Sequence, residues 1–428
     1  MRYICDFHIH SKYSRATSRD MDIEALEKWG RIKGISVLGT GDFTHPLWLK
    51  ELKEKLQPAE EGLFRVSHQQ LATSNQQNDV RFILTSEVSC IYTKHGKVRK
   101  IHLVIFSPSF KVIEKINTQL SWSGNLKSDG RPILGLDTKE VLKIVLSVSP
   151  RALVVPAHVW TPWFSLFGSR SGFDSIEECF GELSPHIFAL ETGLSSDPAM
   201  NWRLSALDKY TLISNSDSHS PRKIGREANV FKGENLSYSS LIGAIRNSKL
   251  PTKDGRLRLV YTIEFFPEEG KYHYDGHRFC QVRLSPEERK KYGGICPNCG
   301  KPVTVGVLSR VDELADREEG FMPKGAHPFK KLVPLAEIIS QVFSQASSTS
   351  KMVEREYQKL VNYFDNELEI LISTPIEEIS NVSPKVAEGI RRVREGNIKV
   401  IPGYDGEYGK VQIFNEEEEK KLNQETLF

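Results

Sequence analysis

The sequence predicts an α/β protein in which a barrel of strand–helix units is followed by a small cysteine-containing module and a mainly helical C-terminal domain. Residues 1 to about 250 alternate short apolar runs with amphipathic segments. Repeated units of this kind form a parallel sheet, which we expect to close into a barrel. Two His and Cys pairs then group within residues 277–299, and helical patterns dominate from residue 335 onward.

The strands and helices of the first part have simple signals. Tyr3–Cys5 is an apolar run that indicates a first strand, and Asp22–Lys33 carries Ile23, Leu26 and Trp29 at helical spacing. Further strands are expected at Ile35–Leu38, Phe82–Leu84, Ile101–Val104, Leu153–Val155, Ile187–Leu190 and Leu212–Ile213, and a further helix at Thr138–Leu146.

Histidines and acidic residues stand at or near the ends of these strands. Residues at positions i and i+2 of a strand point the same way, so His8 and His10 share one face. In a barrel of this type, chemistry collects at the carboxyl ends of the strands. The residues placed in this way are His8, His10, Asp42, His45, Glu87, His102, His158, Asp217 and His219.

The repetition of this placement favours metal ligands over structural residues. A single histidine at a strand end is more often hydrogen-bonded within the fold than bound to a metal. Here the same residue types recur from strand to strand. Imidazole nitrogens with bridging carboxylates suit divalent ions such as Zn²⁺, Mn²⁺ or Fe²⁺, with Mg²⁺ as a further candidate, and so many ligands imply two or three ions.

The bulk composition excludes several classes of protein. The chain has 428 residues, of which 39% are hydrophobic and 26% charged, as in globular proteins of two or three domains. No apolar run approaches the ~20 residues that span a bilayer. The spacing of the six cysteines is not that of a secreted disulfide framework. We therefore expect the protein to be located in the reducing cytoplasm, at the nucleoid. A net charge of +3 means that polyanions must bind to local patches.

The order of the strand-end residues resembles the polymerase and histidinol phosphatase (PHP) superfamily. That superfamily has a distorted (β/α)₇ barrel with three metal ions and hydrolyses phosphoesters. The resemblance implies that one ion is held by His8, His10, Glu87 and Asp217. It implies that Glu87 bridges to a second ion, held by His102 and His158.

The third ion of the superfamily has two candidate ligands after the second strand. The superfamily has an adjacent Asp-His pair there, whereas this chain has Asp42-Phe43-Thr44-His45. Either Asp42 or His45 would hold the third ion together with His219. Both stay open at the level of sequence.

The chemistry expected of such a cluster is phosphoester hydrolysis. Metal ions neutralise charge that develops at phosphorus and lower the pKa of a bridging water to give hydroxide. The candidate catalytic residues are Glu87, Asp217, His219 and Asp197. Asp197, in the run Gly193–Pro198, has an alternative role in a turn or as a helix N-cap before Pro198.

The His and Cys pairs near residue 280 predict a structural zinc site. His277-x-x-Cys280 and Cys296-Pro-x-Cys299 are two half-sites of the spacing that zinc ribbons use. His273 lies four residues before His277 and is the alternative fourth ligand. A closed set of this kind stabilises a small module that lacks its own core.

Basic residues in the second half of the chain are candidate contacts to a DNA backbone. Pro384 follows Ser383, the expected N-cap of a helix over Lys385–Arg394. With Ile376–Ile379 this segment resembles a helix-hairpin-helix, although the hairpin glycines are missing; the alternative is an ordinary helical pair whose arginines favour the helix C-terminus. The candidate backbone contacts are Arg310, Lys330, Lys331, Arg391, Arg392 and Arg394.

The arrangement as a whole resembles the endonuclease Q family. The resemblance rests on the barrel motifs, the Cys-Pro-x-Cys-Gly module, Gly306–Arg317 and Ile401–Gly409, and it covers nearly the whole chain. It implies a DNA repair endonuclease that cuts double-stranded DNA on the 5′ side of uracil, hypoxanthine, xanthine and abasic sites. The products would carry a 3′-hydroxyl and a 5′-phosphate.

A nuclease of this kind needs a pocket for a base flipped out of the duplex. The loop after His158 is rich in aromatic residues, and we expect it to supply that pocket; the alternative is a hydrophobic cover for the barrel mouth. The candidate pocket residues are Trp160, Trp163, Phe164, Phe167 and Ser171.

The last residues carry a separate signal. Gln424, Leu427 and Phe428 form a Gln-x-x-Leu-Phe ending that resembles the bacterial sliding-clamp-binding peptide. The alternative is a frayed tail. The expected domains are the barrel over residues 1–252, the zinc-binding module over 253–325, the helical DNA-binding domain over 326–414 and a charged tail over 415–428.

Two rival functions remain at the level of sequence. One is a small-molecule phosphatase of the histidinol-phosphate type, which would need neither the zinc-binding module nor the basic helical tail. The other is a non-catalytic DNA-lesion or clamp-associated binding protein, against which the near-complete ligand set argues.

Overall fold

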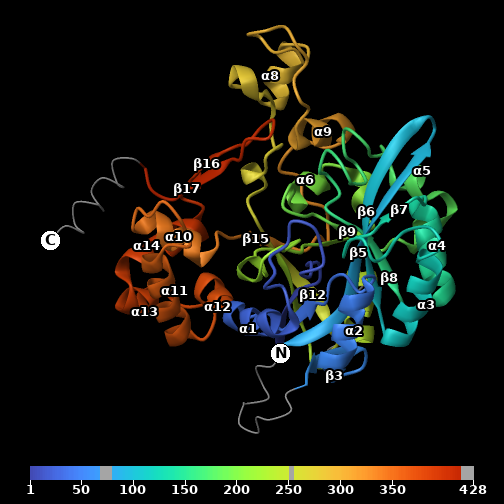
Figure 1. Cartoon of the computed structure of the whole chain (residues 1–428). Coiled ribbons are helices and arrows are strands. Elements are labelled where there is room, and N and C mark those ends of the chain that lie inside the picture. Colours follow the sequence, from blue (N-terminus) through green and yellow to red (C-terminus); the bar gives the residue numbers. More distant parts are fainter. Residues whose placement is uncertain (68–79, 250–254, 416–428) are drawn as a thin grey trace.

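A mixed sheet runs through the centre of the molecule, and helices pack against it (Figure 1). The computed structural model describes residues 1–67, 80–249 and 255–415. The long sheet has the order β15-β12-β11-β1-β2-β5-β4-β3, and β6 continues it from β5 to β8. Its strands are β1 (Arg2–Asp6), β2 (Val37–Gly39), β3 (Leu56–Pro58), β4 (Leu63–Val66), β5 (Arg81–Lys94), β6 (Lys97–Ser107), β7 (Ile133–Leu134), β8 (Leu153–Pro156), β11 (Ala228–Lys232), β12 (Arg258–Glu264) and β15 (Phe329–Lys331).

The β1–β2–β5 part of the sheet is parallel, as expected, but other pairs are not. β5 and β6 form an antiparallel hairpin, and β6 pairs antiparallel with β8. The expectation of repeated strand–helix units is therefore wrong for this segment. Both strands are buried on both faces over much of their length, so the sequence lacks the alternation of a hairpin. The turn at His95 and Gly96 has φ of 52° and 71°, which is typical of a two-residue hairpin turn.

Two further strands, β9 (Ala189–Glu191) and β10 (Thr211–Ile213), pair in parallel with each other. A bridge between Ile9 and Ser218 brings the segment after β10 beside the segment after β1. Four strand ends, those of β1, β8, β9 and β10, thus lead to one region of the molecule.

The helices of the sheet domain begin and end where the sequence has capping residues. In α1 (Ile23–Lys33), Asp22 accepts a hydrogen bond from the Ala25 N–H, and Gly34 ends the helix at φ 85°. The other helices here are α2 (Pro46–Lys55), α3 (Phe110–Leu120), α4 (Thr138–Val148), α5 (Ile176–Phe180), α6 (Pro198–Trp202) and α7 (Tyr238–Arg246). The helices expected over Asp22–Lys33 and Thr138–Leu146 are thereby confirmed.

The sheet extends past residue 252, where composition suggested a boundary. β12 pairs with β11, and Thr262 of β12 lies opposite Phe329 of β15. Strands from the expected second and third domains thus complete the first. Composition misses this because the polar segment that precedes β12 has the character of a linker.

A small module projects from this sheet at the top of Figure 1. It contains the hairpin of β13 (Asp275–His277) and β14 (Val282–Leu284), followed by α8 (Pro286–Lys291). Among the described residues, its apolar core consists of Val282, Leu284, Cys296 and Val303, with Cys280 packed against them. Helix α9 (Val307–Leu314) connects it back to the sheet domain.

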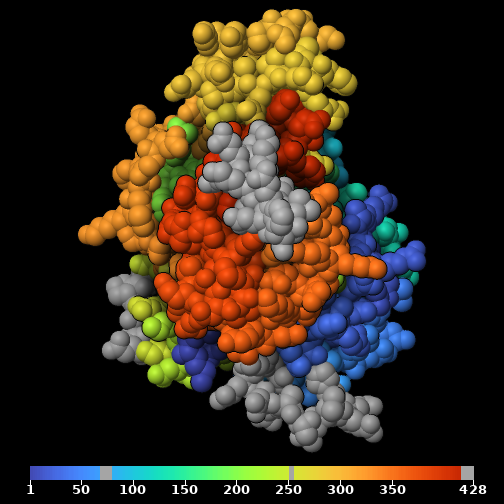
Figure 2. Space-filling view, turned by 90° about the vertical axis from the view of Figure 1, so that its left-hand side faces the viewer, coloured from blue at the N-terminus to red at the C-terminus, as the bar shows by residue number. Residues whose placement is uncertain are grey.

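Helices at the C-terminal end of the described chain form a separate layer beside the sheet, seen from outside in Figure 2. Lys33 of α1 and Glu367 of α12 form a buried ion pair of 2.6 Å that ties the two layers together. No helix of the described residues is both long and apolar enough to cross a membrane. The elements of this layer are α10 (Leu335–Val342), α11 (Lys351–Phe364), α12 (Glu367–Ile372), α13 (Ile376–Val382), α14 (Pro384–Glu395), β16 (Lys399–Ile401) and β17 (Lys410–Gln412).

Candidate metal centre

The ends of β1 and β10 and the middle of β5 bring four ligand side chains to one point. His8 and His10 follow β1, Glu87 lies within β5, and Asp217 follows β10. The His10 N–H donates to the Ser218 carbonyl over 3.0 Å, which fixes the two loops side by side. One ligand atom from each of the four side chains lies within 4.8 Å of the others.

The nitrogen–oxygen distances within this first group are longer than those of short, strong hydrogen bonds. His10 Nε2 lies 3.2 Å from Glu87 Oε2 and 3.1 Å from Asp217 Oδ1. His8 Nε2 lies 3.5 Å from Glu87 Oε2 and 3.7 Å from Asp217 Oδ1. The four side chains surround a space between two imidazoles and two carboxylates.

A second group shares Glu87. Its Oε1 lies 2.7 Å from His102 Nδ1 and 3.1 Å from His158 Nε2, whereas its Oε2 faces the first group. His102 and His158 approach each other to 3.2 Å. All three side chains are buried. Glu87 is thus the bridge between two adjacent sets of ligand atoms.

Unpartnered buried atoms test whether these residues fit metal ions. His8 Nε2, His10 Nε2 and Asp217 Oδ1 are buried and have no hydrogen-bond partner among the described residues. A buried polar atom without a partner costs free energy, so such atoms need an explanation. All three point into the first group, and a cation would satisfy them together. The donors of both groups are nitrogen and carboxylate oxygen, the ligand types of Zn²⁺, Mn²⁺ and Fe²⁺. The residues therefore fit divalent metal ions.

Glu191 orients the ligands of both groups, and sequence reasoning did not include it. His8 Nδ1 lies 3.0 Å from each carboxylate oxygen of Glu191, and the His158 N–H donates to Glu191 Oε2 over 2.8 Å. Asn215 Nδ2 donates to its other oxygen over 2.8 Å. With Nδ1 of His8 held in this way, Nε2 faces the first group. The position of Glu191 at a strand end was the available signal.

Asp42 acts on His10 in the same manner. Its Oδ1 lies 3.0 Å from His10 Nδ1, and its Oδ2 accepts hydrogen bonds from the Ser11 N–H and the Ser14 hydroxyl. With both oxygens engaged in this way, Asp42 is not brought into either ligand group. Its observed position is behind His10, as an orienting carboxylate, and not as a ligand of a third ion.

The third expected ligand set does not come together. Within the sheet domain, the described residues form two ligand groups and no third. His219 Nδ1 lies 2.9 Å from the Asp217 carbonyl, and its ring packs 4.5 Å from that of His10. The His45 ring stacks on Tyr13, with the centroids 4.5 Å apart.

Three of the candidate metal-site residues have a left-handed backbone. The φ angles are 50° at Asp42, 29° at His158 and 45° at Asp217. Residues other than glycine rarely adopt such angles, and they cluster at functional sites. Position 193 requires a glycine, because a Cβ there would lie 2.5 Å from the Cβ of His158.

The charges of the centre favour a cation. Burial raises the pKa of Glu87, but His102, Arg131 and His8 outweigh it and hold this pKa well below its usual range. Burial lowers the pKa of His8, but Glu191 and Glu87 raise it well above its usual range. A divalent ion therefore meets ionised carboxylates and displaces protons from imidazoles.

Arg131 is a second residue that sequence reasoning missed. Its Nη1 lies 3.1 Å from Glu87 Oε2, so its guanidinium pairs with the carboxylate that the two ligand groups share. Residue 131 lies in a loop before β7 with no pattern around it, so the sequence offered no signal.

Asp197 is a helix cap in this structure. Its Oδ1 accepts a hydrogen bond from the Met200 N–H at the start of α6, and its Oδ2 forms a 2.8 Å ion pair with Lys331. It belongs to neither ligand group. The N-cap alternative describes what is observed, because Pro198 at the first helical position needs such a cap.

The candidate DNA-backbone residues mostly engage partners within the chain. Arg310 pairs with Asp174, and Lys331 with Asp197 and Glu268. The Lys330 ammonium lies 5.3 Å from the centre of the Tyr261 ring. On α14, Arg391 and Arg392 pair with Glu388, and Arg394 donates to the carbonyls of Ile370 and Leu371. Arg391, Arg392 and Arg394 thus all have partners within the chain.

The aromatic loop after His158 covers the second ligand group. Trp160 and Phe167 are fully buried, and Trp160 Nε1 donates to Asn201. Phe164 packs on His102 with the ring centres 4.7 Å apart, and Ser171 is buried. Only Trp163 has an open face, at 38% exposure. Trp160 and Phe167 therefore offer no surface on which a base can stack, and their predicted pocket role is corrected to that of a hydrophobic cover.

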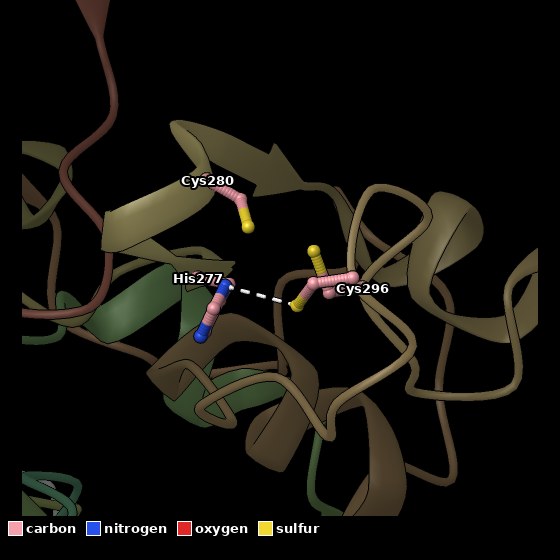
Figure 3. Close-up of side chains that lie close together, drawn as sticks. His277, Cys280 and Cys296 are labelled. Atoms are coloured by element: carbon pink, nitrogen blue, oxygen red, sulfur yellow. Dashed lines mark hydrogen bonds between the residues drawn. The ribbon is translucent and has the colours of Figure 1, made fainter.

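The zinc-binding module brings together the predicted residues. The ligand atoms of His277, Cys280, Cys296 and Cys299 lie within 4.8 Å of one another. Figure 3 shows the labelled side chains of His277, Cys280 and Cys296 pointing toward a common centre. His277 Nδ1 lies 3.6 Å from Cys299 Sγ. His273, the alternative, is buried elsewhere and stacks on Tyr274. Three sulfurs and one nitrogen in a closed set fit a structural Zn²⁺.

Relatives of the chain occur in archaea and bacteria. Residues 334–397 match a family described as the MJ0043 C-terminal domain. The uncharacterized protein MJ0043 of Methanocaldococcus jannaschii is 37% identical over 262 residues, which are 60% of this chain and 31% of that protein. The chain thus corresponds to about a third of that relative's length. The uncharacterized protein YqxK of Bacillus subtilis is 27% identical over 428 residues, 95% of this chain and 98% of that protein.

Two solved structures match over almost the full length. The lesion-specific endonuclease PfuEndoQ from Pyrococcus furiosus has a TM-score of 0.84 and 32% identity, with 97% of this chain and 96% of that chain covered. A structure of endonuclease Q in complex with a 27-mer duplex that has an abasic lesion at the active site has a TM-score of 0.83, also at 32% identity, and covers 97% and 98% of the two chains. This chain belongs to the endonuclease Q family.

Proposed function

We propose that this chain is a DNA repair enzyme that hydrolyses the phosphodiester on the 5′ side of deaminated bases and abasic sites in double-stranded DNA. Membership of the endonuclease Q family makes it a metal-dependent endonuclease. The observation that carries the proposal is the pair of ligand groups that share Glu87. Many enzymes that hydrolyse phosphodiesters bind two metal ions at adjacent sites.

The proposed roles of the protein side chains follow from their contacts. Divalent ions bound here supply charge neutralisation at phosphorus and a more acidic water. Glu191 and Asp42 hold the Nδ1 atoms of His8 and His10, so that both Nε2 atoms face the first ligand group. Arg131 lies against Glu87 and is placed to bind a non-bridging phosphate oxygen.

The proposed substrate rests on the family and on the architecture. The endonuclease Q structure with duplex DNA holds an abasic lesion at its active site. We extend the proposal to uracil, hypoxanthine and xanthine, whose cleavage would leave a 3′-hydroxyl and a 5′-phosphate. We also propose that the mixed sheet closes as the distorted (β/α)₇ barrel of the PHP superfamily, with the strand ends of β1, β8, β9 and β10 around the ions.

A direct experiment separates this proposal from its rivals. The full-length protein is incubated with Mn²⁺, Mg²⁺ or Zn²⁺ and with end-labelled duplexes that carry uracil, hypoxanthine, an abasic site or no lesion. We expect a single nick in the lesion strand and none in the undamaged duplex. The variant Asp217→Ala should lose at least about 10³-fold in rate, because one ligand and one charge are removed. Turnover of only p-nitrophenyl phosphate would support the small-molecule phosphatase, and lesion binding without any turnover would support the binding protein.

A sliding clamp is a second proposed partner. Gln424, Leu427 and Phe428 lie outside the described residues, so the proposal rests on the sequence pattern alone. Leu427 and Phe428 would insert into the pocket of a bacterial clamp. Deletion of residues 424–428 should abolish clamp binding in surface plasmon resonance, whereas Lys420→Ala, just upstream, should leave it intact. Unchanged binding after the deletion would remove this proposal.

A further inference from the structure

The aromatic loop after His158, residues 159–173, is held at two points by Arg310 of α9. Arg310 Nε donates to the Phe167 carbonyl over 3.0 Å, and Nη2 donates to the Phe173 carbonyl over 3.3 Å. Its side chain is only 13% exposed. The five N–H donors of a guanidinium lie in a fixed fork, so one arginine can hold two carbonyls at a set separation. Arg310 therefore ties α9 to the loop that covers the second ligand group.

The loop is packed so that its position at Arg310 determines its position at Thr161. Gly168 follows Phe167, and a Cβ at Gly168 would meet the Thr161 carbonyl. The Ser165 hydroxyl donates to the same carbonyl. The Phe167 N–H donates to the Val159 carbonyl over 2.8 Å, which brings the start of the loop to the part that Arg310 holds. Closely packed segments transmit a displacement from one residue to the next.

Thr161 in turn orients His158. Thr161 Oγ1 lies 3.2 Å from His158 Nδ1, and its hydroxyl donates to the Trp163 carbonyl over 2.8 Å. A hydroxyl has one proton, so the Thr161 oxygen accepts from the Nδ1–H of His158. This tautomer leaves His158 Nε2 without a proton, and Nε2 faces Glu87 Oε1 at 3.1 Å. Thr161 thus acts on the second ligand group as the orienting carboxylates act on the first.

The other side of Arg310 leads to the zinc-binding module. Asp275 is buried in β13, two residues before the zinc-site residue His277. Asp275 Oδ1 accepts from the Gly306 N–H over 2.5 Å, and its Oδ2 accepts from the Ser309 hydroxyl. These two contacts bind the first turn of α9 to β13, and Arg310 is the next residue of that helix. An unbroken series of hydrogen bonds and chain neighbours thus runs from the zinc site to the second ligand group.

We propose that Arg310 and Thr161 are positioning residues through which the zinc-binding module sets the affinity of the second ligand group for its metal ion. Neither side chain is a ligand in the two groups, so both act through His158. Loss of the structural zinc then weakens a metal site that lies in the sheet domain. The inference rests on the proposed endonuclease function for its effect on cleavage, but its effect on metal binding is measured separately.

Replacement of Thr161 tests the link to His158. Mn²⁺ binding to the full-length protein is measured by isothermal titration calorimetry, with His102→Ala and Asp217→Ala as references that mark the second and the first ligand group. Thr161→Val keeps the branched shape but removes the acceptor. It should lower the affinity of the second group by roughly 10- to 100-fold and leave that of the first unchanged. Thr161→Ser keeps the hydroxyl and should restore the parental affinity.

Replacement of Arg310 tests the link to α9. Arg310→Met should retain the structural zinc, weaken Mn²⁺ binding at the second ligand group to a similar extent and speed amide hydrogen exchange in residues 159–173. Arg317→Met is the matched control. Arg317 pairs with Asp208 and donates to the Trp202 carbonyl, so it anchors the segment after α9 to the sheet domain at another place. This variant should bind Mn²⁺ as the parent protein does.

A double-mutant cycle tests whether the zinc acts through Arg310. Cys296→Ser, which removes a zinc ligand, should also weaken the second ligand group. Residues that act along one route give non-additive effects. The double variant Cys296→Ser/Arg310→Met should therefore bind Mn²⁺ no more weakly than the weaker of the two single variants.

The outcomes separate this inference from the proposed function. Parental Mn²⁺ affinity in Thr161→Val or in Arg310→Met would overturn it, and so would additive losses in the double variant, because the zinc would then act by another route. Equal losses in both ligand groups would indicate a general folding defect and would also overturn it. A parent protein that binds Mn²⁺ but cuts no lesion duplex contradicts the endonuclease function alone.

Discussion

Glu191 shows how the precision of the centre depends on a residue that need not touch a metal ion. Both of its oxygens accept hydrogen bonds, from His8, the His158 backbone and Asn215. It therefore orients one imidazole in the first ligand group and places the backbone of another in the second. Carboxylates behind histidine ligands fix the tautomer and raise ligand basicity.

Replacement of Glu191 by glutamine should weaken metal binding. The amide offers one acceptor where three donors converge, so His8 loses its fixed orientation. We expect affinity for Mn²⁺, measured by isothermal titration calorimetry, to fall by roughly 10- to 100-fold. Glu182→Gln, at an exposed carboxylate, is the control. Unchanged affinity in Glu191→Gln would show that Glu191 does not orient the ligands.

Individual ligands were predictable from the sequence to different degrees. The sequence placed His8, His10 and Asp217 at strand ends, and the structure has them there; Glu87 and His102 lie inside β5 and β6 instead. The predicted groups still come together. Asp42 stands at such an end too, but it turns behind His10, because Ser11 and Ser14 donate to it there. A strand pattern predicts which side chains lie near the site, but it does not predict which way each side chain points.

At the scale of elements, the zinc-binding module has almost no apolar core. Its hairpin of β13 and β14 encloses only Val282, Leu284, Cys296 and Val303. A core this small contributes little free energy of folding, so a metal ion must supply most of the cohesion.

Loss of one cysteine should release the zinc ion and loosen the hairpin. We expect Cys296→Ser to lose one Zn²⁺ per chain in atomic emission analysis and to exchange the amide hydrogens of β13 and β14 faster. His273→Asn should retain the zinc ion, because His273 is not part of the ligand set. Full zinc content in Cys296→Ser would contradict this assignment.

Elements were more predictable than their pairing. The N-cap at Asp22 and Pro384 at a helix start gave α1 and α14 nearly residue by residue. The β5–β6 hairpin was missed for two reasons. Its pairing joins residues that are far apart in the sequence, such as Leu84 and Ser107, and both strands are buried on both faces, so neither shows an alternating pattern. The pairing of β12 and β15 with a sheet that begins far earlier in the chain is long-range for the same reason.

At the scale of the whole molecule, buried acids make stability depend on pH. Glu264 is fully buried among the Thr192 and Ser214 hydroxyls, both 3.1 Å away. Burial raises its pKa from 4.5 to about 8, and Asp197 adds to this rise. The folded chain therefore keeps a proton that the unfolded chain releases. The resulting stability is present below the unfolded pKa and is lost as pH rises through the folded one.

The free energy of unfolding should accordingly fall between about pH 5 and about pH 9. Glu264→Gln removes this titration, and the variant should lose less of its stability over the same range. Urea denaturation followed by circular dichroism at both pH values measures the difference. A parent protein as stable at the higher pH as at the lower one would show that Glu264 is ionised in the folded chain.

Cleavage-site mapping tests the central claim most directly. A duplex with one uracil, labelled at the 5′ end of the damaged strand, is incubated with Mn²⁺ and an excess of the protein, and the product is compared with a sequencing ladder. The proposed function predicts one fragment that ends with a 3′-hydroxyl at the nucleotide before the uracil, and the metal centre predicts no fragment with Asp217→Asn. An intact strand with the parent protein, or the same cut in undamaged duplex, would contradict the account.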